Sequence, residues 1–264
     1  MSIELKNVTF AYPNGYIANE HLDLVIDDGE KVAIVGQNGA GKTTAVKLMN
    51  GLNRPQSGEI FVNGDNIKSK TCAQVSREVG YVFQNPDDQI FNNTVRAEVE
   101  YMPRYLKLDP SEIKTRCDRA IELTGIGKYA KKNPLDIPYP IRKFVAIAAI
   151  IATNPKYLIL DEPTAGQDNW GNAILQDIIT EMQKENIGII AITHDMDFVA
   201  ENFTRIVAMA NKRIIADSTA KKIFWNDDIL YRSKIKKPQI AQLAMELQLD
   251  GNILFADELT NKFD

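Results

Sequence analysis

The sequence is poor in cysteine, which limits its redox chemistry and its capacity for metal clusters. Two cysteines, Cys72 and Cys117, occur among 264 residues, and their spacing matches no metal-binding motif. Secreted domains that depend on disulfides have a much denser cysteine pattern. We therefore expect both thiols to be reduced and structural, as in a cytoplasmic protein.

The sequence also lacks a long apolar segment. Its longest uninterrupted apolar run covers residues 144–152, about half of the ~20 residues that a membrane-spanning helix requires. The first residues, MSIELKNVTF, do not show the basic and then apolar pattern of a signal segment. Any role at a membrane is therefore expected to be peripheral.

Positive charge is not in excess either. The formal net charge is −4 at pH 7, which argues against a general nucleic-acid-binding surface, although a local basic patch is compatible with it. A composition of 44% hydrophobic and 25% charged residues is typical of a globular protein. At this length we expect one large domain with a small appendage.

What the sequence does contain is a glycine-rich phosphate-binding motif. Residues 36–43 read GQNGAGKT and match the pattern G-x-x-x-x-G-K-[ST] at every fixed position. An apolar run precedes them and a segment with helical spacing follows, which is the strand-to-helix junction that the motif needs. The glycines let successive N–H groups curl around phosphate oxygens. The residues expected to bind the nucleotide are Gly36, Asn38, Gly39, Ala40, Gly41, Lys42, Thr43 and Thr44.

Two carboxylates follow a second apolar run. Asp161 and Glu162 come directly after residues 157–160, whose letters YLIL indicate a buried strand. Ligands of open α/β sheets bind at the carboxyl ends of strands. We expect Asp161 to hold Mg²⁺ through water and Glu162 to orient or deprotonate the attacking water, which are tasks of phosphoryl transfer. The alternative interpretation of this pair is a solvated turn.

Two more polar residues stand at expected strand ends. His194 follows the apolar residues 188–193, and Gln84 ends the short strand of residues 80–84. His194 is expected to contact the γ-phosphate, and Gln84 to reach Mg²⁺ or the attacking water; structural roles are the alternatives. With Thr43 and Asp161, Gln84 completes the expected Mg²⁺ site. His21, the only other histidine, is expected to be structural.

The remaining pattern predicts an α/β fold with a helical insertion. Residues 59–63 and the following Asn63-Gly64 turn indicate a β-hairpin arm. Helical spacing at residues 95–105, 110–123 and 141–152 then predicts a helical subdomain over about 95–152. The chain next returns to the continuous apolar runs of buried parallel strands.

In this order, these motifs resemble the nucleotide-binding subunit of an ATP-binding cassette (ABC) transporter over residues 1–216. The resemblance implies a P-loop NTPase (RecA-like) core with an antiparallel β arm, the helical subdomain, and a small C-terminal domain at residues 217–264. It implies ATP and Mg²⁺ as ligands, and an adenine that stacks on Tyr12. It also implies catalytic roles for Glu162, His194 and Gln84.

Two segments narrow the resemblance to the energy-coupling factor and cobalt-type importers. Residues 83–91, FQNPDDQIF, and the tail from 237 to 263 are similar to those proteins. The implied function is ATP hydrolysis that powers uptake of a vitamin or metal ion, at the cytoplasmic face of the membrane. The implied partners are a second cassette and integral membrane components that dock near residues 85–101, without nucleic acid. The alternatives are a cassette ATPase acting on ribosomes or DNA, and a structural ATP-binding partner.

The family's signature, Leu-Ser-Gly-Gly-Gln, is the one motif that does not match. It falls on residues 137–141, which read IPYPI. In the family this segment reaches across a dimer to the γ-phosphate of the other subunit's ATP, with a serine hydroxyl and backbone amides. Pro138 and Pro140 have no N–H to donate. Tyr139 is bulky at a point where the backbone must approach the phosphate closely, and Ile141 ends the segment. We therefore expect a heterodimer with a cassette whose signature is complete, although a helix can still begin at this proline-rich segment.

The tail beyond residue 216 has a helical apolar pattern that includes Ile240, Leu243 and Leu247. Two interpretations of this face remain open. It packs on its own domain, or it contacts a second cassette, as the resemblance suggests.

Overall fold

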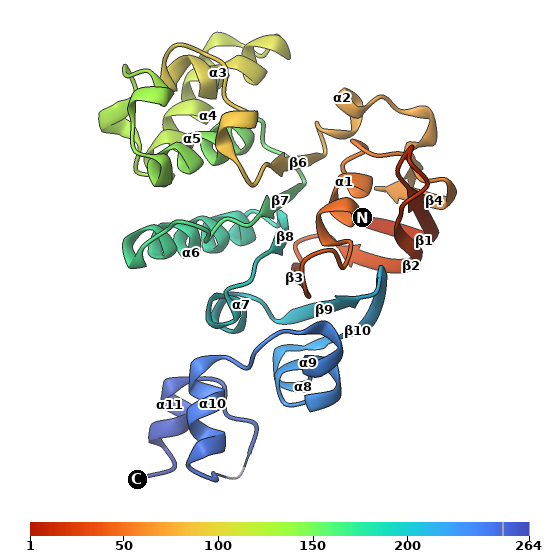
Figure 1. Ribbon diagram of the computed structural model, residues 1–264. Coiled ribbons are helices and arrows are strands. Elements are labelled where there is room, and N and C mark those ends of the chain that lie inside the picture. The colour runs from red at the N-terminus through yellow and green to blue at the C-terminus, as the bar shows by residue number, and fades with distance from the viewer. Residues whose placement is uncertain (250, 264) are drawn as a thin grey trace.

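The computed structural model describes residues 1–249 and 251–263. Asp250 and Asp264, two positions of the predicted C-terminal domain, lie outside the described residues. Within these ranges the chain forms two β-sheets and several groups of helices (Figure 1). This arrangement confirms the predicted α/β fold class with an antiparallel arm.

The larger sheet has six strands, and all of its neighbouring pairs except one are parallel. Its order is β10 (Arg213–Thr219), β9 (Arg205–Ala210), β3 (Lys31–Val35), β8 (Gly188–Ile192), β7 (Tyr157–Asp161) and β6 (Val79–Val82). Strands β6, β7 and β8 are buried at every residue, as expected for a parallel sheet covered on both faces. Because these strands and β3 run in one direction, their carboxyl ends meet at a single edge.

The smaller, antiparallel sheet forms the arm. Its order is β2 (Ile17–Asp27), β1 (Ser2–Ala11), β4 (Ser57–Val62) and β5 (Asp65–Asn66). Helix α1 (Lys42–Met49) contributes Val46, Leu48 and Met49 to a core that it shares with this sheet. The same core includes Val32 and Ile34 of β3, whereas Ala33 and Val35 face the opposite side of the large sheet. This alternation follows from the two-residue period of a strand.

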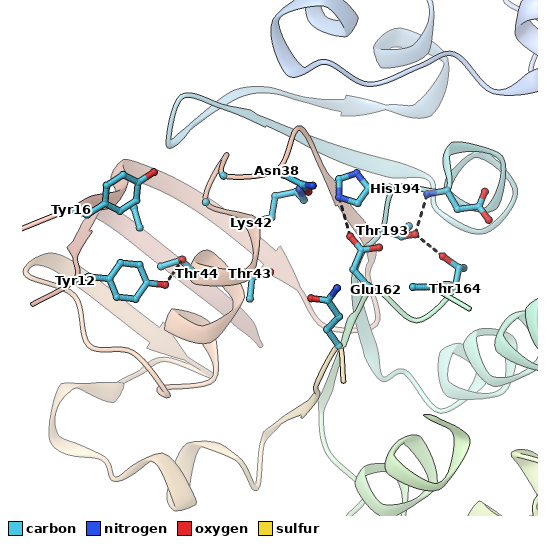
Figure 2. A pocket seen from close by; sticks show the side chains of 16 residues that line it. Tyr12, Tyr16, Asn38, Lys42, Thr43, Thr44, Glu162, Thr164, Thr193 and His194 are labelled. Carbon is cyan, nitrogen blue, oxygen red and sulfur yellow. Dashed lines mark hydrogen bonds and ion pairs between the residues drawn. The ribbon is translucent and has the colours of Figure 1, made fainter. Parts of the chain in front are cut away.

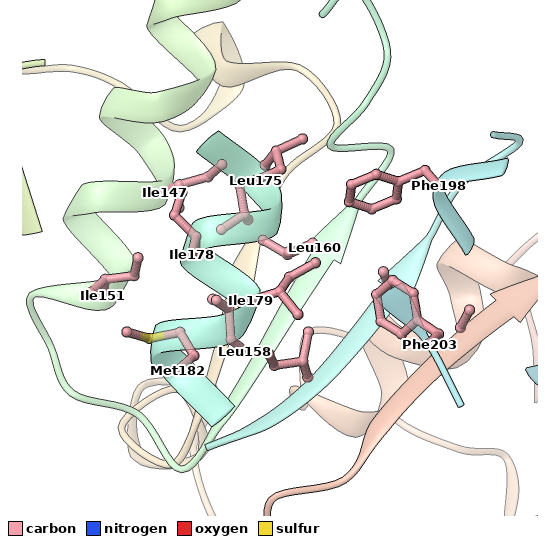
Figure 3. Close-up of a cluster of buried hydrophobic side chains, with 14 of the residues drawn as sticks. Ile147, Ile151, Leu158, Leu160, Leu175, Ile178, Ile179, Met182, Phe198 and Phe203 are labelled. Carbon is pink, nitrogen blue, oxygen red and sulfur yellow. The ribbon is translucent and has the colours of Figure 1, made fainter. Parts of the chain in front are cut away.

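The opposite face of the large sheet is covered by helices α5 (Tyr139–Ile151), α6 (Asn169–Lys184) and α7 (Met196–Asn202). Figure 3 shows Leu175, Ile178, Ile179 and Met182 of α6 packed beside α5 and β7. No helix was expected from the sequence between β7 and β8, so α6 is an addition to the prediction. Its buried residues nevertheless recur with helical spacing.

Helices α3 (Val95–Tyr105) and α4 (Pro110–Leu123) pack with α5 away from the arm (Figure 1). The bounds of α3 and α4 agree with the predicted helices. Thr94 caps α3 by accepting from the Ala97 N–H at 3.1 Å, and Asp109 caps α4 directly before Pro110. A proline at this position loses no helical hydrogen bond.

Short elements complete the chain. They are α2 (Cys72–Val75) and the 3₁₀ turns Ile67–Ser69, Pro86–Asp88, Gly127–Tyr129 and Pro134–Asp136. After the last strand follow α8 (Ala220–Phe224), α9 (Asp227–Ser233), α10 (Gln239–Glu246) and α11 (Ala256–Thr260). In the part of the chain that the structure describes, no helix is long and apolar enough to cross a membrane.

The apolar residues of α10 do not all share one environment. Ala241 and Ala244 are fully buried, and Ile240 packs on the cluster formed by Ala244, Ile253 and Leu259. Leu243 and Leu247 are 42% and 47% exposed. The predicted face therefore divides into a part that packs within the chain and a part that faces outward.

The two thiols differ in environment, which gives a test of the fold. Cys117 is fully buried on α4, and burial raises the pKa of its thiol to about 11, whereas Cys72 is half-buried. Because the thiolate is the reactive form, we expect only Cys72 to react with a thiol reagent in the native protein at about pH 8. The measurement is the time course of labelling with Ellman's reagent.

Cys72→Ser should remove the fast labelling phase, and Cys117→Ser should leave it intact. In denaturant both thiols should react. Rapid labelling of Cys117 in the native protein would contradict the packing of α4.

Candidate active site

The phosphate loop joins β3 to α1 in a conformation that requires glycine. Gly36, Gly39 and Gly41 have φ angles of 145°, 80° and 99°, values that side chains with a Cβ rarely adopt. A Cβ on Gly36 would lie 2.2 Å from the Met209 carbonyl oxygen, and one on Gly41 would lie 2.4 Å from that of Ala18. The loop is therefore pressed against its neighbours and leaves its amides for a ligand, a geometry that fits a nucleotide phosphate.

Lys42 is fixed within this loop. Its Nζ donates hydrogen bonds to the carbonyl oxygens of Gly36 at 2.7 Å and Gln37 at 3.1 Å. Burial lowers the pKa of Lys42, while the nearby Glu162 and Asp161 oppose that shift. The ammonium is thus a preorganised positive charge at the loop.

An open cavity of about 570 Å³ lies at the loop (Figure 2). Its lining residues are Tyr12, Tyr16, Ala18, Asn38, Gly39, Gly41, Lys42, Thr43, Thr44, Gln84, Glu162, Thr164, Ala165, Thr193, His194 and Asp195. Most of the predicted site residues are brought together here. Gly36, Ala40 and Asp161 are not part of the lining, and Ala40 and Asp161 are buried at 1% and 2% exposure.

The side chains of Glu162 and His194 lie next to each other in the cavity lining (Figure 2). Nε2 of His194 lies 3.2 Å from Oε1 of Glu162. Burial, and then the charge of Lys42, lower the pKa of His194, which favours the neutral imidazole. Burial raises the pKa of Glu162, opposed most by Lys42. A carboxylate with a raised pKa is a stronger base than an ordinary glutamate.

Asp161 accepts hydrogen bonds from two hydroxyl groups. The Thr43 hydroxyl donates to Oδ1 at 3.4 Å, and the Tyr81 hydroxyl donates to Oδ2 at 2.7 Å. Mg²⁺ prefers such hard oxygen ligands and usually combines one or two of them with substrate phosphates. Thr43 and Asp161 therefore fit a Mg²⁺ site, while Gln84 lines the cavity nearby. The sequence did not reveal the part of Tyr81, because only strand pairing brings it to Asp161.

Two tyrosines line the far end of the cavity. The hydroxyl of Tyr12 lies 3.0 Å from that of Thr44, and the Tyr12 ring packs edge-on against Phe10. Tyr16 is 48% exposed, and Lys212 Nζ lies 4.3 Å from the centroid of its ring. Both rings offer stacking surface for a planar base. From the sequence, only Tyr12 was expected to contact the base. The signal that could have indicated Tyr16 is that it is a second aromatic residue, four positions after Tyr12.

A hydroxyl pair that the sequence did not reveal joins two loops of the site. Thr164 and Thr193 have their side-chain oxygens 2.7 Å apart, and the Thr193 hydroxyl also accepts from the Asp195 N–H at 3.1 Å. Asp195 in turn caps α7 by accepting from the Phe198 N–H. These bonds fix the segment on which His194 stands.

The proline-rich segment lies outside this cavity. It begins α5, with Pro138 as the N-cap residue, so the helix starts two residues before the predicted start at residue 141. Pro138 and Tyr139 are exposed, whereas Pro140 and Ile141 are half-buried. Because the Arg142 N–H already bonds to the Pro138 carbonyl, Tyr139 and Ile141 carry the free N–H groups of this first turn. A helix start normally offers more such donors to a ligand.

Comparison with known proteins agrees with this geometry. Residues 19–165 match the family model described as ABC transporter. The chain is 36% identical to the energy-coupling factor transporter ATP-binding protein EcfA of Methanosphaera stadtmanae, over 97% of this chain and 92% of that protein. It is 34% identical to EcfA of Methanocaldococcus jannaschii, over 95% and 91%.

Among solved structures, cbiO1 of Clostridium perfringens, described as part of the ABC transporter complex cbiONQ, superposes with a TM-score of 0.78 at 32% identity. The superposition covers 94% of this chain and 98% of cbiO1. A dimeric cassette bound to ADP and Pi, at 24% identity and a TM-score of 0.75, shares the fold. The resemblance to the energy-coupling factor cassettes is confirmed, and the chain belongs to the ABC transporter family as an ATP-binding, ATP-hydrolysing subunit.

Proposed function

We propose that this chain is the ATP-hydrolysing subunit of an energy-coupling factor type importer. The observation that carries the proposal is the convergence of the phosphate loop, Glu162 and His194 on one cavity, with Asp161 directly behind Thr43. The names of the EcfA relatives and of cbiO1 support the transport role. The transported solute is a vitamin or metal ion, which a separate membrane component selects.

In the proposed reaction, water attacks the γ-phosphorus of ATP and the bond to ADP breaks. Lys42 holds the phosphates, and Glu162 orients the water and accepts its proton, a role that its raised pKa favours. His194 holds the carboxylate of Glu162 through the 3.2 Å contact and lies beside the γ-phosphate position. Gln84 completes the water and metal environment, and adenine stacks on Tyr12. Mg²⁺, when bound at Thr43 and Asp161, neutralises charge on the phosphates.

The partners follow from the surface and the degenerate signature. Residues 1–216 form the nucleotide-binding domain, with a helical subdomain at about 95–152, and residues 217–264 form a small domain that contributes to dimerisation. The exposure of Leu243 and Leu247 supports the role in dimerisation.

The membrane components dock near residues 85–101, where Phe91 is 64% exposed and packs edge-on against Tyr101. The chain is thus peripheral at the cytoplasmic face of the membrane.

The rival functions have less support. A cassette acting on ribosomes or DNA would use a basic surface, and the relatives named above are described as transporter proteins. A structural ATP-binding partner would not need a carboxylate with a raised pKa in contact with a histidine. Co-purification with a multi-span membrane protein, rather than with RNA, would distinguish the first rival.

The catalytic role of Glu162 is tested by Glu162→Gln. We expect ATP binding to persist and steady-state turnover in the assembled complex to fall by about 10²-fold or more, because the base is lost. Turnover is measured as phosphate release, and binding as fluorescence of a nucleotide analogue. Glu122→Gln, at an exposed position on α4, is a control for the same change of charge outside the site. A Glu162→Gln complex with the normal rate would refute the role.

The proline-rich segment predicts an asymmetric heterodimer. Each composite site of a cassette dimer combines the phosphate loop of one chain with the signature of the other. Two copies of this chain would lose a hydroxyl and amide donors at both sites, and one such donor commonly contributes about 10²- to 10³-fold in rate. With a complete partner, only the site built on Lys42 and Glu162 of this chain is intact.

Lys42→Ala is therefore expected to abolish ATPase activity and transport in the heterodimer. The matching lysine change in the partner should be milder. Both are measured in the same reconstituted complex. Equal losses from the two changes, or strong ATPase activity of this chain alone, would contradict the asymmetry.

A further inference from the structure

A buried lysine of α5 has no part in the reaction described so far. Lys143 is 3% exposed, on the second turn of the helix that begins at the proline-rich segment. Its neighbours along the helix, Phe144 and Val145, are core residues. Burying an ammonium group costs free energy unless the group is hydrogen-bonded. The hydrogen-bond partner of Lys143 therefore indicates the role of this side chain.

The partner is the main chain of the catalytic glutamate. Nζ of Lys143 donates a hydrogen bond to the carbonyl oxygen of Glu162 at 2.6 Å. Glu162 has a φ angle of 50°, a left-handed conformation that is unfavourable for a residue with a Cβ. Its N–H donates to the carbonyl of Ile192 on β8 at 2.8 Å. The strained residue is therefore held from both sides, by β8 and by α5.

Helix α5 also contacts two loops of the site, the one that follows Glu162 and the turn that follows Gln84. Gln167 donates from Nε2 to the Pro140 carbonyl at 3.1 Å. Its side chain packs against Gly171, where an added Cβ would lie 2.2 Å from Oε1 and 3.1 Å from Cβ of Gln167. On the other side, Arg142 forms an ion pair of 2.6 Å with Asp87, in the turn after Gln84. A shift of α5 would thus reach the site through several fixed contacts.

We propose that Lys143 is a positioning residue that holds the main chain of Glu162 in its left-handed conformation, so that α5 determines where the catalytic carboxylate points. This inference rests on the proposed function, because it acts through Glu162. The helix that would face the partner's ATP is then mechanically linked to the chain's own site. The degenerate signature loses donors toward the partner but keeps this link.

The test uses Lys143→Met, which keeps the apolar stem and removes the donor. In the assembled complex we expect kcat to fall roughly 10- to 100-fold, as for a misplaced catalytic group, while KM for ATP changes less than about twofold. The matched control is Lys114→Met on α4, where the side chain is 75% exposed, and it should keep the wild-type rate. In a Glu162→Gln background, Lys143→Met should cause no further loss, because the two changes act through one group.

A second measurement does not depend on activity. Hydrogen–deuterium exchange of the isolated chain should be faster in a peptide covering residues 162–167 of Lys143→Met, and unchanged in peptides of α4. Unchanged exchange at residues 162–167, or an equal loss of rate whether Lys143→Met is made in the wild-type chain or in Glu162→Gln, would overturn the inference. Absence of ATPase activity in the wild-type complex would instead count against the proposed function, and the exchange result would still decide the role of Lys143.

Discussion

The parallel pairing of β6, β7, β8 and β3 is the constraint on which the site depends. Parallel strands present their carboxyl ends at one edge, so segments far apart in sequence deliver Gln84, Glu162, His194 and the phosphate loop to one cavity. The apolar strands make this pairing stable only because helices cover one face and the arm covers the other. The position of the site residues at this edge therefore depends on the burial of both faces of the large sheet.

The electrostatics of the cavity follow from the same enclosure. Burial raises the pKa of Glu162 and lowers that of Lys42 and of His194. Each shift disfavours the charged form, and the lysine and the glutamate partly restore each other's charge. Removing Lys42 would therefore raise the pKa of both Glu162 and His194, because its charge lowers both.

The sequence was sufficient for features whose signal is local. The phosphate loop, the helices at residues 95–105 and 110–123, and the two carboxylates at the end of β7 were all predicted from contiguous patterns. Helix α6 was overlooked although Leu175, Ile178 and Met182 have helical spacing. Tyr81 and Lys143 are different cases. Their roles come from the register of strands and the placement of α5 on the sheet, which no single-sequence pattern specifies.

The two prolines at the start of α5 also bear on how a cell makes such a complex. In the proposed heterodimer, this chain would hydrolyse ATP only after it had bound its partner, because two copies of it would lack a complete signature. Newly synthesised chains would therefore not consume ATP while they wait for assembly, and energy use would begin only in a transporter with both cassettes in place. Under the proposed function, the degenerate signature would thereby restrict ATP hydrolysis to assembled transporters.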